Sequence, residues 1–416
     1  MDSLIKKTLV AIAFVISLMP LTLSGQEYSD VDSHVASIVQ GQQDVLQLTR
    51  ELVKPFQSPE KQIRAIFSWI TNNIAYDYQA LLRGQVRLAT AEDVLQTRKA
   101  ICGGYARLLK KMARTAGFEA ELVGGFSKGY GYDTSNPFAD RNRHAWNAVK
   151  VDGTWRLLDA TWGAGYISDG KFKRSFNDYY FFTPPEELIQ THYPEQRRWQ
   201  LLDEHRNRTN FMAMPLTKPA FFRYDMRMIS HTDRKIQASD SLSLKLSGSK
   251  DVVLLSRLYV GENELDDMLS FAQRSDDGFE VRAIFPQPSN YILRIFAKRK
   301  TDTGNYQWLL DYEVEASKGV RQAAGFPEKL GSFDDFNARI YEPMSRFLTA
   351  GDSVDFKLTV EDARELALIH EDSFQFLQKD GEVFSGRFEV PPADFFIGAR
   401  FPNSDYFMYL LRYEGW

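Results

Sequence analysis

The sequence predicts an α+β N-terminal domain over residues 26–210, followed by two β-sandwich modules over 211–320 and 321–416. Apolar residues recur at helical spacing in the first part of the chain, whereas short strand-like runs separated by turns fill the second. At roughly 150 residues per domain, the 416-residue chain has room for two or three domains. Its 44% hydrophobic and 25% charged content is that of a globular protein, which excludes collagen, a whole-chain coiled coil and general disorder.

The first 25 residues match a secretory signal peptide. Lys6 and Lys7 precede an apolar run over 8–23, and the small residues Ser24 and Gly25 follow it. A helix that spans a bilayer needs about 20 apolar residues, so this shorter run favours cleavage, with an uncleaved membrane anchor as the alternative. The sequence therefore predicts a secreted or periplasmic protein that has no membrane span after the signal is removed.

Four helical segments are predicted next. Apolar residues at helical spacing indicate the first one over 31–52. The Ser-Pro pair at 58–59 matches the N-cap and first position of a second helix. Thr90 begins a short third helix with a capping motif, and the fourth runs over 102–116, where a glycine ends it.

Strand patterns then replace the helical ones. Strands are predicted over 120–123, 144–151 and 155–160. The Asp-Gly pair at 152–153 is a strong signal for a hairpin between the last two. Helices that precede an antiparallel sheet in this way are typical of an α+β domain.

The second half of the chain contains a weak internal repeat. Residues 238–246 (ASDSLSLKL) resemble 350–358 (AGDSVDFKL), and 309–313 (LLDYE) resemble 410–414 (LLRYE). Offsets of about 100 residues suit two consecutive β-sandwiches of the immunoglobulin-like type. Chance alternation in strand-rich sequence is the alternative explanation.

Composition argues against several kinds of partner. A formal net charge of −4 and a pI near 6.0 leave no excess of lysine and arginine to neutralise nucleic-acid phosphates. The single cysteine, Cys102, excludes a disulfide within the chain and a cysteine-rich zinc site. His192 and His205 show no metal-ligand spacing and are interpreted as structural. The sequence therefore predicts no nucleic-acid partner, no cofactor and no metal site.

Cys102 is the candidate nucleophile. An unpaired cysteine in an exported protein is either a reactive thiol or a small buried hydrophobe. The predicted helix start lowers the pKa of a thiol placed there, and a neighbouring imidazolium lowers it further. Pairing across the hairpin turn puts His144 opposite position 161, two residues from Asp159 and on the same sheet face. A carboxylate there can fix the orientation of the imidazole, as in other triads.

Six motifs stand in order along the first domain: RKAICGGYA (98–106), HAWN (144–147), WRLLDATWGAG (155–165), YFFTPPEEL (180–188), HYP (192–194) and WQLL (199–202). Residues 58–202 thereby resemble the transglutaminase-like superfamily of papain-type folds, in its kyphoscoliosis peptidase-like branch. The resemblance implies a papain/transglutaminase-like fold and a triad of Cys102, His144 and Asp159. The Ala-Ile-Cys-Gly context of the cysteine departs from the Gly-Gln-Cys-Trp of crosslinking animal transglutaminases, which argues against protein crosslinking.

Three more residues are candidates for the oxyanion or substrate site. Gly103 leaves the helix start uncovered, so that backbone amides can meet a substrate oxygen, or it eases tight packing. Gln96 lies six residues before Cys102, as the oxyanion glutamine of papain-like enzymes does, although a solvated helix position is the favoured alternative. Trp146 is interpreted as a core aromatic that walls the site, with shielding of the thiolate from water as its other role.

The leading functional hypothesis is an exported, cysteine-dependent acyl-transfer enzyme that acts on protein or peptide amides. Water as the acceptor makes it a peptidase or amidase, and an amine makes it a transglutaminase; hydrolysis is favoured because no amine-recruiting site is evident. The alternative is a catalytically silent scaffold that binds proteins or cell-wall polymers. In either case the C-terminal β domains are expected to bind a substrate or partner.

Overall fold

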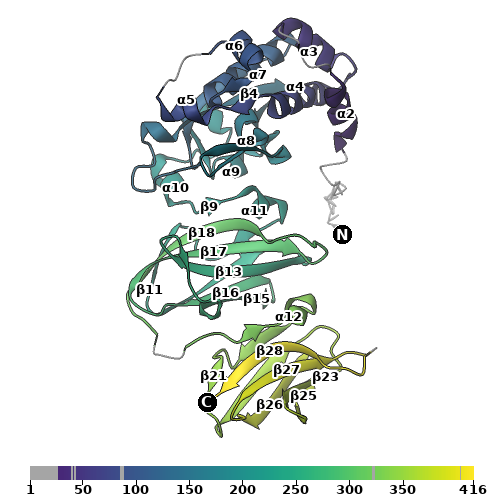
Figure 1. The fold of residues 1–416 in the computed structure, drawn as a ribbon, viewed down its shortest axis with the longest axis vertical. Helices are drawn as coiled ribbons and strands as arrows, with labels where there is room; N and C mark the ends of the chain where they lie inside the picture. Colours follow the sequence, from purple (N-terminus) through teal and green to yellow (C-terminus); the bar gives the residue numbers. More distant parts are fainter. Residues whose placement is uncertain (1–26, 39–40, 42–43, 85–88, 321–323, 403) are drawn as a thin grey trace, which may run out of the picture. The chain divides into compact units, whose positions relative to one another are not determined.

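The computed structural model describes residues 27–38, 41, 44–84, 89–320, 324–402 and 404–416 (Figure 1). The expected signal peptide, 1–25, lies outside these residues. Contacts between Cα atoms divide the chain into two units, one of Met1–Leu122 with Trp146–Phe181 and one of Val123–Ala145 with Phe182–Trp416. No helix in the described part of the chain is long and apolar enough to cross a bilayer.

The first part of the chain is helical, with two short strands between its helices. The elements are α2 (Ser29–Ser37), α3 (Val45–Val53), α4 (Pro59–Asn73), β1 (Ala75–Tyr76), α5 (Tyr78–Leu82), α6 (Ala91–Thr97), β2 (Lys99–Ala100) and α7 (Cys102–Thr115). Two predicted helix starts are confirmed. Ser58 accepts a hydrogen bond from the Lys61 amide before Pro59 begins α4, and Thr90 and Asp93 form a reciprocal capping box on α6.

The single helix predicted over 31–52 is wrong, because the segment forms α2 and α3. Gly41 lies between them with φ of +120°, a backbone conformation that favours glycine. Asp44 then caps α3, and its carboxylate accepts the amide of Gln47 at 2.9 Å. The apolar spacing continues across the turn because both helices bury one face.

A four-stranded sheet follows, in the order β5-β4-β3-β8. The elements of this region are β3 (Ala120–Ser127), η1 (Asp140–Asn142), β4 (Arg143–Val151), β5 (Thr154–Leu158), α8 (Ala160–Ala164), β6 (Gly165–Ser168), β7 (Lys171–Arg174), η2 (Asp178–Tyr180), α9 (Pro185–Leu188), β8 (His192–Pro194) and η3 (Arg197–Gln200). The β4–β5 register pairs Val151 with Thr154 and Ala148 with Leu157, which confirms the hairpin. Pairing ends at Asn147 and Leu158.

The predicted position of His144 opposite residue 161 is therefore wrong. The chain leaves the sheet at Asp159, which caps α8, so residue 161 is helical. At the other edge, β8 pairs with β3 and sets Ser127 opposite His192.

The first sandwich begins after the connecting elements α10 (Arg208–Ala213), β9 (Leu216–Thr217) and α11 (Pro219–Arg223). It consists of β10 (Arg227–Met228), β11 (Lys235–Ala238), β12 (Ser241–Ser247), β13 (Val252–Val260), β14 (Asn263–Glu264), η4 (Asp267–Leu269), β15 (Ser270–Ser275), β16 (Gly278–Ile284), β17 (Ser289–Arg299) and β18 (Gln307–Ala316). One sheet has the order β10-β12-β16-β15 and the other β11-β18-β17-β13-β14, with β9 on β18. Side chains of both sheets, including Leu244, Val281, Leu293 and Tyr312, form one buried core.

The second sandwich repeats this topology. Its elements are β19 (Glu328–Lys329), α12 (Gly331–Asp335), β20 (Arg339–Glu342), β21 (Phe347–Leu348), β22 (Ser353–Thr359), β23 (Glu365–His370), β24 (Ser373–Phe376), β25 (Gln378–Asp380), β26 (Val383–Glu389), β27 (Asp394–Arg400) and β28 (Met408–Gly415). The sheet orders are β20-β22-β26-β25 and β19-β28-β27-β23-β24. The repeated segments occupy equivalent strands, β12 with β22 and β18 with β28, which confirms the internal repeat.

A buried lysine follows β3. Lys128 is 3% exposed, and its ammonium group donates to the Met214 carbonyl at 2.9 Å and lies 4.5 Å from the centre of the Phe211 ring. Its backbone amide donates to the carbonyl of Thr191, next to β8. Burial, with a smaller contribution from Arg234, lowers the pKa of Lys128 to about 7.

Candidate active site

Cys102 is the first residue of α7, a 14-residue helix. The two-residue strand β2 leads directly into it and pairs in parallel with β1, so that Tyr76 lies opposite Ala100. The amide of Asp77 also donates to the Ala100 carbonyl at 2.9 Å. Cys102 is partly exposed and forms no disulfide, so the structure places the predicted nucleophile at the predicted helix start.

The two glycines after Cys102 have different roles in packing. A Cβ on Gly104 would lie 2.6 Å from the Cβ of Ala100 and 3.0 Å from a methyl of Val94, so glycine there lets α7 approach α6 and β2 closely. A Cβ on Gly103 would meet only the end of the Arg107 side chain, at 3.4 Å. Tight packing thus explains Gly104, whereas nothing in the packing requires glycine at position 103.

His144 lies on β4, whose position is fixed by a buried amide. The Asn147 side chain donates to the carbonyl of Ala106 on α7 at 2.9 Å and to that of Glu121 on β3 at 3.2 Å. It therefore ties the strand that carries His144 to the helix that carries Cys102. The bond to Ala106 is buried and the bond to Glu121 is partly buried, which makes the register of β4 costly to change.

Asp159 caps α8 with one carboxylate oxygen. Its Oδ1 accepts the amides of Thr161 at 2.8 Å and Trp162 at 3.1 Å, and its own amide donates to the Tyr180 carbonyl. The side chain is 1% exposed. Because hydrogen bonds from backbone amides stabilise the charged form of a carboxyl group, this cap holds a fixed carboxylate inside the domain.

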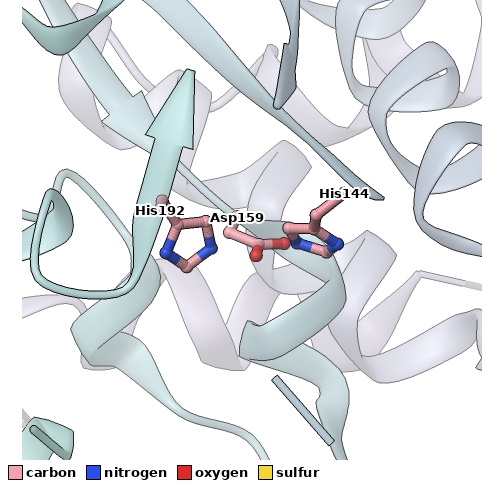
Figure 2. Close-up of side chains that lie close together, drawn as sticks. All are labelled: His144, Asp159 and His192. Carbon is pink, nitrogen blue, oxygen red and sulfur yellow. The ribbon is translucent and has the colours of Figure 1, made fainter. Parts of the chain in front are cut away.

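His144, Asp159 and His192 come together, as Figure 2 shows, with the two imidazole rings on either side of the Asp159 side chain. One ligand atom from each residue lies within 4.8 Å of the other two, and all three residues are buried. The two rings are 5.4 Å apart between centroids. The sequence does not indicate this cluster, because His192 shows no metal-ligand spacing and only the fold brings it close to His144 and Asp159.

Tyr76 is a second residue that the sequence did not indicate. Burial raises the pKa of its phenol, and the charges of Cys102 and then Asp159 raise that pKa further. Its ring also lies near that of Tyr105, one turn beyond Cys102 on α7. The hydroxyl therefore stays protonated at neutral pH in the field of two predicted triad members. Two-residue strands such as β1 carry no sequence signal that would have revealed it.

The structure also bears on the alternatives left open for Trp146 and Gln96. Trp146 is 1% exposed on β4, as expected of a core aromatic. Gln96 is exposed on α6, which matches the solvated alternative.

Comparison with known proteins decides the family. Residues 46–160, which contain Cys102, His144 and Asp159, match the transglutaminase-like superfamily, and residues 208–327 match the KY-like, immunoglobulin-like domain. The chain belongs to the transglutaminase-like superfamily. Its α+β fold with immunoglobulin-like domains after it is thereby established.

The chain is similar to several curated proteins and solved structures. Kyphoscoliosis peptidase of Homo sapiens is 30% identical over 320 residues, 76% of this chain and 47% of that protein. Hillarin of Drosophila melanogaster is 33% identical over 216 residues, 48% of this chain and 26% of that protein. A solved transglutaminase structure is 18% identical with a TM-score of 0.24 and 40% coverage of each chain. The chain spans about half the length, or less, of the curated relatives it matches.

Proposed function

We propose that Cys102, His144 and Asp159 act as a triad in an exported enzyme that hydrolyses amide bonds of proteins or peptides. The observation that carries this proposal is that His144 lies close to Asp159 inside a transglutaminase-like core. The one cysteine of that core begins α7 and is partly exposed. An imidazole oriented by a fixed carboxylate is the base that a thiol nucleophile requires. The match of residues 1–25 to a secretory signal peptide supports export.

The reaction would run in two steps. His144 takes the proton from the Cys102 sulfur, the thiolate attacks the amide carbonyl carbon, and the C–N bond breaks as the imidazolium returns that proton to the leaving amine. Water then loses a proton to His144 and attacks the thioester, which releases the carboxylic acid and the thiol. Asp159 holds the imidazole in the orientation that serves both proton transfers.

The amide at the start of α7 is the natural site for the tetrahedral oxyanion. In the first turn of α7 the amides of Gly104 and Tyr105 already donate to the Ile101 carbonyl, so the amide proposed for this role is that of Gly103. Gly103 presents no side chain over this turn. The protonated hydroxyl of Tyr76 is a further hydrogen-bond donor in the surroundings of Cys102.

The C-terminal modules are proposed to bind the substrate or a partner. On the second sandwich, Phe374 and Phe376 are each about half exposed, and both rings lie against that of Phe407. Exposed aromatic clusters of this kind are typical of binding surfaces. Such a surface also suits the alternative function, a scaffold without catalysis.

Hydrolysis of a peptide library by the full chain, run beside an amine-incorporation assay, distinguishes these functions. We expect peptide cleavage by the wild type, no amine incorporation, and no cleavage by Cys102→Ala, because the variant lacks the nucleophile. Folding of Cys102→Ala is checked by circular dichroism. Incorporation of an amine would reassign the acceptor, and absence of any Cys102-dependent reaction would favour the scaffold.

A further inference from the structure

The cluster of His144, Asp159 and His192 has the donor set of a transition-metal site. Two imidazoles and one carboxylate are a ligand set that zinc and related first-row ions accept. The three side chains come from β4, the cap of α8 and β8, and their exposed fractions are 8%, 1% and 1%. Among the residues that the structure describes, no other group of three potential ligands lies so close together.

The imidazole of His192 is oriented by a neighbour. Nδ1 of His192 lies 2.9 Å from the Thr191 hydroxyl oxygen, and that hydroxyl donates its only proton to the Leu188 carbonyl at 3.4 Å. In the tautomer in which Nδ1 donates to this hydroxyl oxygen, the lone pair of the neutral ring is on Nε2. A hydrogen bond on the far ring nitrogen is the usual support of a histidine that binds a metal.

The Asp159 carboxylate is also held in place. Two backbone amides bind its Oδ1 and fix the plane of the group. Zinc binds nitrogen and oxygen ligands at about 2.0–2.2 Å in a tetrahedral arrangement. Ligand atoms around zinc are therefore closer to one another than the distances of up to 4.8 Å between the ligand atoms of His144, Asp159 and His192. A contraction on the order of 1 Å would close the three side chains around an ion.

We propose that His144, Asp159 and His192 bind a divalent transition ion such as Zn²⁺, with water as the fourth ligand. The sulfur of Cys102 is not among the ligands. Because the ion occupies the imidazole that the triad needs as its base, Zn²⁺ is a reversible inhibitor of amide hydrolysis; this consequence rests on the proposed function. The proposed metal binding does not depend on the proposed function.

The test is a titration of the metal-free full chain with Zn²⁺ in equilibrium dialysis and with Co²⁺ in visible absorption. We expect one equivalent of tight binding and the absorption bands of a four-coordinate Co²⁺ ion. His192→Ala should weaken binding about 100-fold, and Thr191→Val, which removes only the supporting hydroxyl, about tenfold. His231→Ala is the matched control, because His231 is exposed on the first sandwich, and its binding should equal that of the wild type.

Two further variants make the outcome decisive. Cys102→Ala should keep the metal, whereas binding that is lost in Cys102→Ala and kept in His192→Ala would overturn the proposal in favour of a sulfur site. Failure of the wild type to take up either ion also overturns it. Hydrolysis by the chelated enzyme is measured separately: active enzyme that binds no metal refutes only the metal site, and a metal-binding chain without Cys102-dependent cleavage refutes only the proposed function.

Discussion

Replacing His144 by alanine is expected to reduce amide hydrolysis by about 10³-fold, because the thiol loses its base and the leaving amine loses its acid. Asp159→Asn should retain far more activity than Asp159→Ala. An asparagine keeps an oxygen for the amides of Thr161 and Trp162, and an asparagine supports the histidine in papain-like Cys-His-Asn enzymes. The measurement is the hydrolysis rate at saturating peptide for the three variants.

Stability measurements separate chemistry from folding in this series. Asp159→Ala removes a helix cap and should also lose about 1–2 kcal/mol of unfolding free energy. His144→Ala removes no cap, so it should lower the hydrolysis rate without a comparable loss of unfolding free energy. Equal hydrolysis by His144→Ala and wild type would refute its role as the base.

Replacing Lys128 by methionine is expected to reduce the rise of stability between about pH 7 and 10, to which Lys218, whose pKa burial lowers to about 8, also contributes. Burial lowers the pKa of Lys128 to about 7 in the folded chain, whereas an unfolded lysine titrates near 10.4. Between these values the unfolded chain holds the additional proton, so the unfolding free energy of the wild type rises with pH; below about pH 7 both states are protonated and this gain is absent.

The gain amounts to at most about 4 kcal/mol across this window. The Phe211 ring and the Met214 carbonyl favour the ammonium form and offset part of it. Urea unfolding at several pH values should show the slope in the wild type and in Lys245→Met, a control at an exposed position on β12. A slope as steep in Lys128→Met as in the wild type would show that the Lys128 ammonium does not contribute to it.

Local signals in the sequence predicted local structure well. Caps at Ser58 and Thr90 specify helix starts through bonds within three residues, and the Asp-Gly turn sets the β4–β5 register. The helix over 31–52 failed because apolar periodicity does not register a turn such as that at Gly41. The repeat succeeded because equivalent strands in two sandwiches need similar alternation.

The candidate site was predictable only in part. Cys102, His144 and Asp159 stand out by residue type and by their motifs. The predicted pairing of His144 with residue 161 is wrong, because Asp159 caps α8 and residue 161 is helical. His192 and Tyr76 were missed because the pairings of β8 with β3 and of β1 with β2 join segments far apart in sequence. Such pairings depend on the whole fold and leave no mark at the residues themselves.

The pH profile of Cys102 alkylation by iodoacetamide tests the central claim most directly, because it needs no substrate and the chain has one cysteine. An ordinary thiol, half ionised near pH 8.5, reacts about tenfold more slowly for each pH unit below that value. A sulfur paired with the His144 imidazolium should instead react at a nearly constant rate from about pH 6 to 8, and His144→Ala should restore the tenfold slope. A wild-type profile with the ordinary slope, unchanged by His144→Ala, would contradict the account.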